Sequence, residues 1–301
     1  MDYRQLQLFL AAAERLNLTH AAEAMNITQP GLSKSLQRLQ RDLGAKLYHR
    51  RGRGIELTEV GRTLLKHAKL METQLATVKS EIKGISRGTS GHARIGAGPS
   101  WLSRHLPEAI GQIMAKHPGI HFTVDTGFPD KLIGRLRQGE LDIVIGALPE
   151  NRLDPDLRFV RLTSDVIHVV GRKEHPLLRK RVRVLADYAA QLWVLPNRQE
   201  LVRQRLTSTF RASGLSEPVI AVETESLSLI LSILRATDCL GMTTSQILTQ
   251  SEAHGIVTVD QISLRFKRDS GIISQRYAEP ASSVRLVVGE LRRIASKQAS
   301  N

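Results

Sequence analysis

Hydrogen-bonding side chains recur along one side of the segment that follows Ile27. They are Gln29, Ser33, Lys34, Gln37 and Arg38. Gln and Lys side chains can hydrogen-bond base edges, whereas Ser, Arg and a helix N-terminus can hold phosphates. This set of side chains therefore predicts a surface that fits the major groove of DNA.

The element that must position these side chains is a helix beginning near Gln29. Leucines at 32, 36, 39 and 43 recur at spacings of 4, 3 and 4 residues, which predicts one apolar face opposite the polar set. Thr28 has a short hydroxyl side chain suited to capping the free amides. Pro30 is tolerated in the first turn because its missing N–H costs nothing there.

Two shorter amphipathic helices are expected before this one. Leu6, Phe9, Leu10 and Ala13 recur at helical spacing in the first, and Thr19 is predicted to cap the second, in which residues 21, 22 and 25 face inward. Asn26 and Ile27 then make the turn. This order predicts a helix-turn-helix.

Arginines cluster in the segment Lys46-Leu-Tyr-His-Arg-Arg-Gly-Arg-Gly-Ile-Glu-Leu-Thr58. It predicts two short strands joined by a turn with Gly52 and Gly54, and it places Arg50, Arg51 and Arg53 near the tip. Such a wing would lie along phosphates, and one arginine could enter a narrow, A·T-rich minor groove. A single arginine here would be an ordinary solvated charge. The prediction of a DNA-contacting wing therefore depends on the clustering of the arginines and on their position directly after the helix-turn-helix.

The charge distribution agrees with contact to nucleic acid. The formal net charge is +14, and the first 90 residues hold 15 Lys and Arg against 8 Asp and Glu. The remaining residues hold 28 against 21, over more than twice the length. The basic density is therefore concentrated on the predicted winged helix, where it favours salt-dependent phosphate contact.

The run AAEAMNITQPGLSKSLQRLQRDLG from residue 21 to residue 44, followed by LYHR at 47–50 and LTEVG at 57–61, resembles the amino-terminal domain of LysR-type transcriptional regulators. Two departures are mild, because the family usually has phenylalanine where Tyr48 stands and arginine or lysine near Lys34. The resemblance implies that Gln29, Pro30, Ser33, Lys34 and Arg53 contact DNA. The full set of predicted DNA-binding residues is Thr28, Gln29, Pro30, Ser33, Lys34, Gln37, Arg38, Arg50, Arg51 and Arg53.

A long helix is predicted from Thr58 to about Arg87, a stretch without proline. Its apolar residues alternate at spacings of 4 and 3, which is a heptad seam on which two helices can associate. The predicted dimerisation residues are Leu64, Ala68, Met71, Leu75, Val78, Ile82 and Ile85. The alternative is that the seam packs on its own chain. Gly84, Gly88 and Gly91, with small polar residues between them, predict a hinge.

From His92 onward short strands alternate with helices, which predicts a mostly parallel sheet covered by helices. The fold class is thus α plus α/β: an N-terminal winged helix-turn-helix, a long linker helix and, by the family resemblance, a two-lobed α/β effector domain like a periplasmic binding protein. The expected boundaries are 1–58, 59–90 and 91–301, with lobe I at 91–162 and 269–301 and lobe II at 163–268.

Ligands in open α/β sheets bind at the carboxyl ends of strands, so residues just past those ends are the effector-binding candidates. They are Ser100, Trp101, Thr126, Gly127, Phe128, Asn197, Arg198, Glu225, Ser226 and Thr243. Ser100 and Ser226 could equally be plain helix caps. Arg198 suits a small organic acid, which the family commonly binds, whereas Glu225 would repel one.

Catalytic and metal chemistry find little support in the sequence. Cys239 is the single cysteine and stands at the start of an apolar strand, which favours a buried structural thiol. The ten histidines lack metal-like spacing, and the chain has no phosphate-binding loop, Gly-x-Ser-x-Gly or Cys-x-x-Cys motif. No enzyme, cofactor or metal is expected.

The sequence therefore predicts a cytoplasmic regulator without a signal peptide or membrane span, whose partners are double-stranded promoter DNA, a small-molecule effector and RNA polymerase. It is expected to be a homodimer, and the family resemblance favours a tetramer. Two rival functions remain: an architectural protein that binds DNA without sequence preference, and a solute-binding or enzymatic α/β protein with an incidental helical extension.

Overall fold

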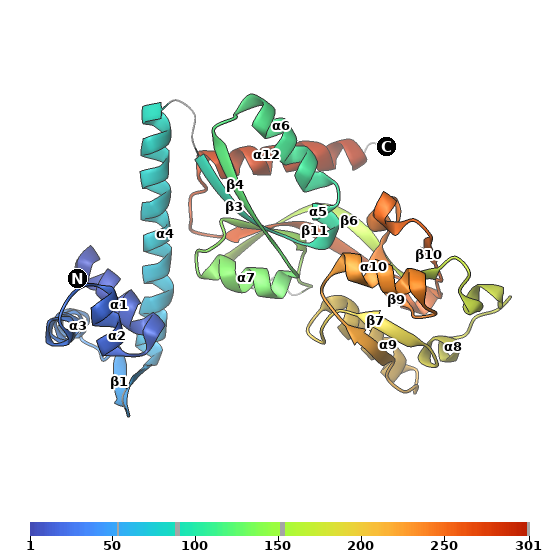
Figure 1. The fold of residues 1–301 in the computed structure, drawn as a ribbon, viewed down its shortest axis with the longest axis horizontal. Helices are drawn as coiled ribbons and strands as arrows, with labels where there is room; N and C mark the ends of the chain where they lie inside the picture. The colour runs from blue at the N-terminus through green and yellow to red at the C-terminus, as the bar shows by residue number, and fades with distance from the viewer. Residues whose placement is uncertain (53, 88–90, 151–153, 300–301) are drawn as a thin grey trace. The chain divides into compact units, whose positions relative to one another are not determined.

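The computed structural model describes residues 1–52, 54–87, 91–150 and 154–299. The chain forms two compact units, an amino-terminal helical unit and a carboxyl-terminal α/β unit (Figure 1). Within the described ranges, no helix combines the length and the apolar character needed to cross a membrane.

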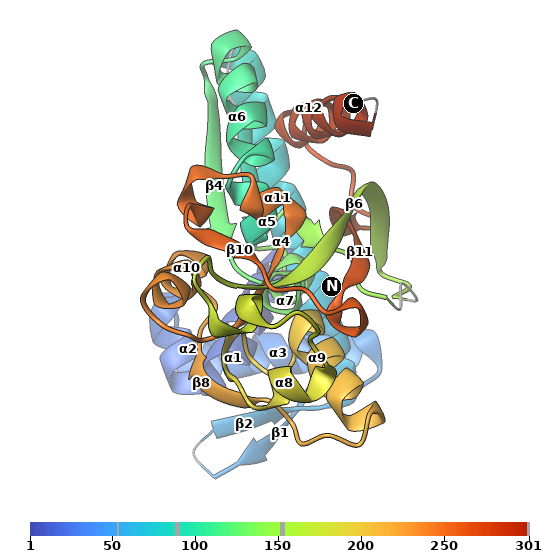
Figure 2. The same ribbon diagram turned by 90° about the vertical axis from the view of Figure 1, so that its right-hand side faces the viewer.

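Three helices and a hairpin build the amino-terminal unit. The helices are α1 (Tyr3–Arg15), α2 (Leu18–Ala24) and α3 (Gln29–Leu43), and the hairpin pairs β1 (Tyr48–Arg51) with β2 (Gly54–Leu57) in antiparallel register (Figure 2). Phe9, Leu32, Leu36, Leu39 and Leu47 are fully buried at its centre. The predicted winged helix-turn-helix is present, with α4 (Glu59–Arg87) after the wing.

Three local expectations for this unit are wrong. Asn17, not Thr19, caps α2, because its side chain accepts from the amides of Thr19 and His20. Leu43 is 39% exposed, because α3 ends there and Gly44 turns the chain with a positive φ. The helix α4 continues through Gly84, since one glycine costs a helix interior only about 1 kcal/mol. The predicted hinge residues 88–90 lie outside the described residues.

The carboxyl-terminal unit has two lobes joined by two long strands, β6 (Leu157–Arg172) and β11 (Phe266–Gln275). In the first lobe, β3 (Gly91–Ala97) pairs in parallel with β4 (Ile120–Thr126) and β5 (Ile143–Ala147). Successive side chains of β5 point to opposite faces of the sheet, so Ile143 and Ile145 pack in one hydrophobic core and Val144 packs in the other. The first core is covered by α5 (Pro99–Leu102), α6 (His105–Lys116) and α12 (Ser282–Ala299), the second by α7 (Pro129–Arg137).

The second lobe packs helices on both sides of short strands. β7 (Leu192–Leu195) and β8 (Val219–Glu223) form a parallel pair, and β7 lies next to β9 (Gly241–Thr244). β9 and β10 (Ile256–Thr258) each pair with β6. One core of this lobe is built around Trp193, Tyr188 and Phe210 and includes residues of α8 (Leu185–Ala189) and α9 (Leu201–Ala212). The other core lies under α10 (Leu227–Ala236) and α11 (Ser245–Leu248).

The expected mostly parallel sheet is wrong for the strands that join the lobes. β11 is antiparallel to both β5 and β6, and β6 is antiparallel to β9 and β10. At the register shift between Ser270 and Gly271, a Cβ on Gly271 would lie 2.0 Å from the carbonyl oxygen of Val160. Only glycine allows the two strands to approach so closely at this point.

Candidate nucleic-acid interface and interlobe cleft

The helix α3 presents its polar face to solvent. Thr28 caps it by accepting from the Gly31 amide at 3.2 Å. Gln29 donates to the Ser33 hydroxyl at 3.0 Å, one turn further on, which orients both side chains along the helix. Lys34, Gln37 and Arg38 are exposed. The side chains that the sequence assigned to base edges therefore share one accessible surface on a helix whose opposite side is fully buried.

The wing carries two exposed arginines among the described residues. Arg50 and Arg51 lie at the end of β1, and Arg51 forms a 2.8 Å ion pair with Glu56 on β2. Both partners are mostly exposed, so this pair contributes roughly 0–1 kcal/mol to stability and still lowers the net positive charge beside it. Arg53, at the predicted tip, lies outside the described residues.

The apolar seam of α4 divides into two parts. Ala68 is buried against Leu6 and Leu10 of α1, and Leu64 packs on the same core. Met71, Val78 and Ile82 are about half exposed, at 52%, 46% and 58%. The start of the seam is therefore part of the winged-helix core, and only the part beyond Ala68 is open. The side chain of Ile85 lies outside the described residues.

Two adjoining cavities lie between the lobes. The inner cavity has a volume of about 60 Å³ and the outer one about 530 Å³, and both are lined by Pro99, Glu225, Leu227 and Ile247. The inner cavity is mostly apolar, with contributions from α5, β6, β9, α10 and β11. A ligand could therefore extend from the inner space outward between the lobes.

The candidate effector residues do not all reach this cleft. Ser100, Phe128 and Thr243 line the inner cavity, Thr126, Gly127 and Ser226 line the outer one, and Glu225 lines both. Asn197 lines neither cavity, although its amide donates to the Glu225 carboxylate at 2.9 Å. Arg198 is exposed and lines neither.

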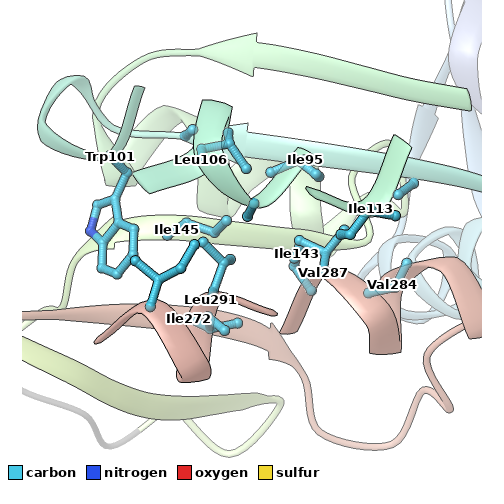
Figure 3. Packing of buried hydrophobic residues seen from close by; sticks show 14 residues of the cluster. Ile95, Trp101, Leu106, Ile113, Ile143, Ile145, Ile272, Val284, Val287 and Leu291 are labelled. Atoms are coloured by element: carbon cyan, nitrogen blue, oxygen red, sulfur yellow. The ribbon is translucent and has the colours of Figure 1, made fainter. Parts of the chain in front are cut away.

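Trp101 is part of the first lobe's core, and its predicted place in the cleft is wrong. Its ring is 1% exposed and packs among the buried aliphatic side chains shown in Figure 3. Its indole N–H donates to the Ser270 hydroxyl at 2.5 Å, and Ser270 donates to the Gly146 carbonyl at 2.8 Å. The short helix α5 turns Trp101 inward while Ser100, one residue earlier, borders the cavity.

Polar contacts join the two lobes across the cleft. Lys131 on α7 contacts the carboxylate of Glu225 at 2.6 Å, and the Gln246 amide donates to the Ser100 carbonyl at 2.8 Å. The hydrogen bond from Lys131 is the main reason why the pKa of Glu225 lies below its usual range. The negative charge that the sequence placed at the mouth of the cleft is therefore paired with a lysine from the other lobe.

Two charged residues of this region escaped the sequence reasoning because neither follows a strand end. Glu200 is 6% exposed at the start of α9, and burial, then the nearby Asp130 and Glu225, raise its pKa to about 8. Arg268 lies inside β11 and lines the inner cavity. Burial lowers the pKa of its guanidinium, while Asp165 and Glu200 raise it.

A hydrogen-bonded chain of Ser245, His168 and Asp260 also went unrecognised in the sequence. The His168 ring joins the Ser245 hydroxyl at 2.8 Å and the Asp260 carboxylate at 2.6 Å. None of the three residues lines either interlobe cavity, and Asp260 also accepts from the Val169 amide at 3.1 Å. The chain ties β6 to the segments after β9 and β10. Among the described residues, no cluster of His, Cys, Asp or Glu is arranged to hold a metal ion.

The fold and these surfaces define a class: a winged-helix DNA-binding protein with a two-lobed ligand domain. Residues 3–62 match the model of the bacterial regulatory helix-turn-helix proteins of the lysR family, and residues 86–296 match the LysR substrate binding domain. The chain belongs to the LysR family of DNA-binding transcriptional regulators.

Relatives and solved structures agree with this family. The chain is 31% identical to the HTH-type transcriptional regulator GbpR of Azospirillum brasilense over 79% of this chain and 70% of that protein. It is 30% identical to an SDS degradation transcriptional activation protein of a Pseudomonas species, over 92% and 88%. Full-length CbnR, solved with its target DNA, shares the fold at 21% identity with a TM-score of 0.63, over 97% and 99% of the two chains.

Proposed function

We propose that this regulator reads a partly palindromic promoter site through paired α3 helices and responds to a small organic acid bound between its lobes. The observation that carries the proposal is the accessible polar face of α3, with Gln29 and Ser33 joined side by side and Lys34 and Gln37 beside them. Base-edge reading requires such groups on a helix that is rigidly packed from behind.

The proposed organisation is a DNA-binding region at 1–58, a linker at 59–90 and an effector domain at 91–301. The exposed Met71, Val78 and Ile82 of α4 support self-association, because apolar side chains that face solvent are stabilised by packing against a second copy. We propose a cytoplasmic homodimer that pairs into tetramers. Closure of the lobes on the effector changes the spacing of the DNA-binding regions and so the access of RNA polymerase.

The architectural alternative predicts phosphate contact without base preference. Exposed Arg50 and Lys34 support phosphate binding under either hypothesis, whereas the Gln29 amide, oriented by its hydrogen bond to Ser33, is of the type that pairs with base edges and so favours base reading. The presence of a cleft with two cavities also favours a ligand-responsive protein, since an architectural protein has no need of one.

Selection of binding sites from a random DNA pool by the full chain at physiological salt tests the reading of sequence. We expect an inverted repeat, whose preference Gln29→Ala blurs at defined positions, while Arg50→Ala weakens all sequences about equally and lowers the salt slope by about 1. Gln191→Ala, on the α/β unit, is the matched control. No enrichment, or enrichment unaffected by Gln29→Ala, would favour the architectural alternative.

A further inference from the structure

The inner cavity is bordered by an arginine that lacks a counter-charge in contact. The Nη2 group of Arg268 donates to the Ser100 hydroxyl at 3.2 Å, whereas its Nε is buried and has no hydrogen-bond partner. Ser100 is neutral, and no ion pair within the described ranges of the chain includes Arg268. Most of the donors of this guanidinium remain available.

An unpaired charge that is partly removed from water is costly, and here the Nε donor is fully buried, so the surroundings of Arg268 are those of an incomplete binding site. Arginine remains protonated in proteins, and it presents its N–H groups in a planar fork that matches a carboxylate. One edge of the guanidinium is formed by Nε and a terminal nitrogen. On this edge, the Nε–H group has no protein acceptor. An anion entering the inner cavity would therefore meet an unsatisfied donor.

The competing role for Arg268 is structural. Asp165 is its cross-strand neighbour in the β6–β11 register, and Asp165 Oδ2 is also buried without a hydrogen-bond partner. Asp165 Oδ1 already accepts from the Val166 amide at 2.8 Å. A rotation of either side chain could close an Arg268–Asp165 ion pair, and the experiment must separate this from ligand binding.

The rest of the cleft limits the chemistry of the anion. Phe128, Ile167 and Met242 are among the apolar residues around the inner cavity, so the group next to the charge must be apolar. Glu225 lines both cavities and its carboxyl is ionised, so a second negative charge on the ligand would be repelled. A monoanion therefore fits better than a dianion.

Volume sets the direction in which the ligand extends. The inner cavity of about 60 Å³ is well below the roughly 150 Å³ of an engineered cavity that accepts benzene, so it holds a head group and little more. The outer cavity, about 530 Å³, is reached past Leu227 and Ile247, which line both. An apolar chain of a few carbons can follow this route.

We propose that Arg268 is the anion-binding residue of the cleft, holding the carboxylate of a small monocarboxylic acid whose apolar chain passes Leu227 and Ile247. This assignment rests on the proposed effector function and adds to it the residue that selects the charge. Ser100 supports the guanidinium through its hydroxyl, and the Glu225 carboxylate disfavours diacids.

The test measures thermal unfolding and calorimetric binding of the full chain with butyrate, its neutral analogue butyramide and the diacid succinate at constant ionic strength. Butyrate should bind, and butyramide and succinate should bind at least tenfold more weakly. Arg268→Gln should lose at least tenfold in butyrate affinity and Arg268→Lys should retain part of it. Arg265→Gln, on the exposed segment before β11, should bind as the unmodified protein does.

Asp165→Asn separates the two roles of Arg268. If Arg268 binds the anion, removing the nearby carboxylate should strengthen butyrate binding. If it is structural, Arg268→Gln and Asp165→Asn should lower the melting temperature alike. Butyrate binding that survives Arg268→Gln, equal binding of butyramide, or no binding to the unmodified protein overturns the assignment. The first two outcomes leave a ligand-binding cleft in place, and DNA-site selection tests the regulator independently.

Discussion

Replacing Glu200 by glutamine should stabilise the protein at alkaline pH and leave it unchanged in acid. The carboxyl of Glu200 is buried, and its pKa is raised from 4.5 to about 8. In the unfolded chain the group ionises near pH 4.5, whereas in the folded protein it keeps its proton until about pH 8. Between these values the folded state binds more protons, so stability falls as the pH rises.

The size of this effect follows from the two pKa values. One pKa unit corresponds to about 1.4 kcal/mol, so the wild-type protein should lose about 3 kcal/mol of unfolding free energy between pH 5 and pH 8 through this group. Glutamine resembles the protonated carboxyl and cannot ionise. We compare the melting temperature of Glu200→Gln minus that of the wild type at the two pH values. This difference should be roughly 6–12 °C larger at pH 8 than at pH 5.

Thermal unfolding of both proteins at pH 5, 6.5 and 8, followed by circular dichroism, measures this difference. Glu279→Gln is the matched control, because Glu279 is exposed and its replacement should shift the melting temperature equally at every pH. A difference between wild type and Glu200→Gln that does not change with pH would refute the reasoning. So would a Glu200→Gln protein less stable than the wild type at pH 8.

Three further predictions test the packing. Gly271→Ala should cost about 3 kcal/mol or more in unfolding free energy, measured by urea titration, because its Cβ would lie 2.0 Å from a backbone oxygen. Gly289→Ala, with open space around it, should be neutral or stabilising in the same assay. Ser270→Ala should cost about 2–3 kcal/mol, measured by tryptophan emission in urea, because the buried Trp101 N–H loses its acceptor. Ala68→Glu should unfold the winged helix, because Ala68 is buried against α1. Val78→Glu should leave the melting temperature unchanged and weaken self-association in sedimentation, because Val78 is exposed. Equal effects of the two substitutions would contradict the division of the seam.

The helices of the winged unit were predictable because their signals are local. Leucine spacing and the Thr28 cap placed the start of α3 near Gln29, where it is, since both signals act within a few positions of the chain. The cap of α2 was misplaced because Asn17 and Thr19 are both capping residue types, and only the hydrogen bonds distinguish them. The seam of α4 divides at Ala68 because burial against α1 depends on tertiary contact, which heptad spacing does not contain.

The cleft was predictable in outline and not in detail. Strand-end reasoning placed Ser100, Phe128 and Thr243 at the inner cavity, which they line, since carboxyl ends of strands do meet between the lobes. That they bind an effector stays a prediction. It misplaced Trp101, because one residue of helical rotation turns a side chain from the cavity into the core. It missed Arg268, which borders the inner cavity from within β11, a strand that passes from one lobe to the other. Such a position depends on antiparallel pairing between distant segments, which local pattern does not show.

DNA footprinting on a selected operator, with and without butyrate at a concentration that occupies the cleft, tests the regulatory mechanism most directly. We expect butyrate to alter the footprint of the unmodified protein and to leave that of Arg268→Gln unaltered, since the DNA contacts of this variant are unchanged. Identical footprints for the free and the butyrate-bound unmodified protein would contradict it.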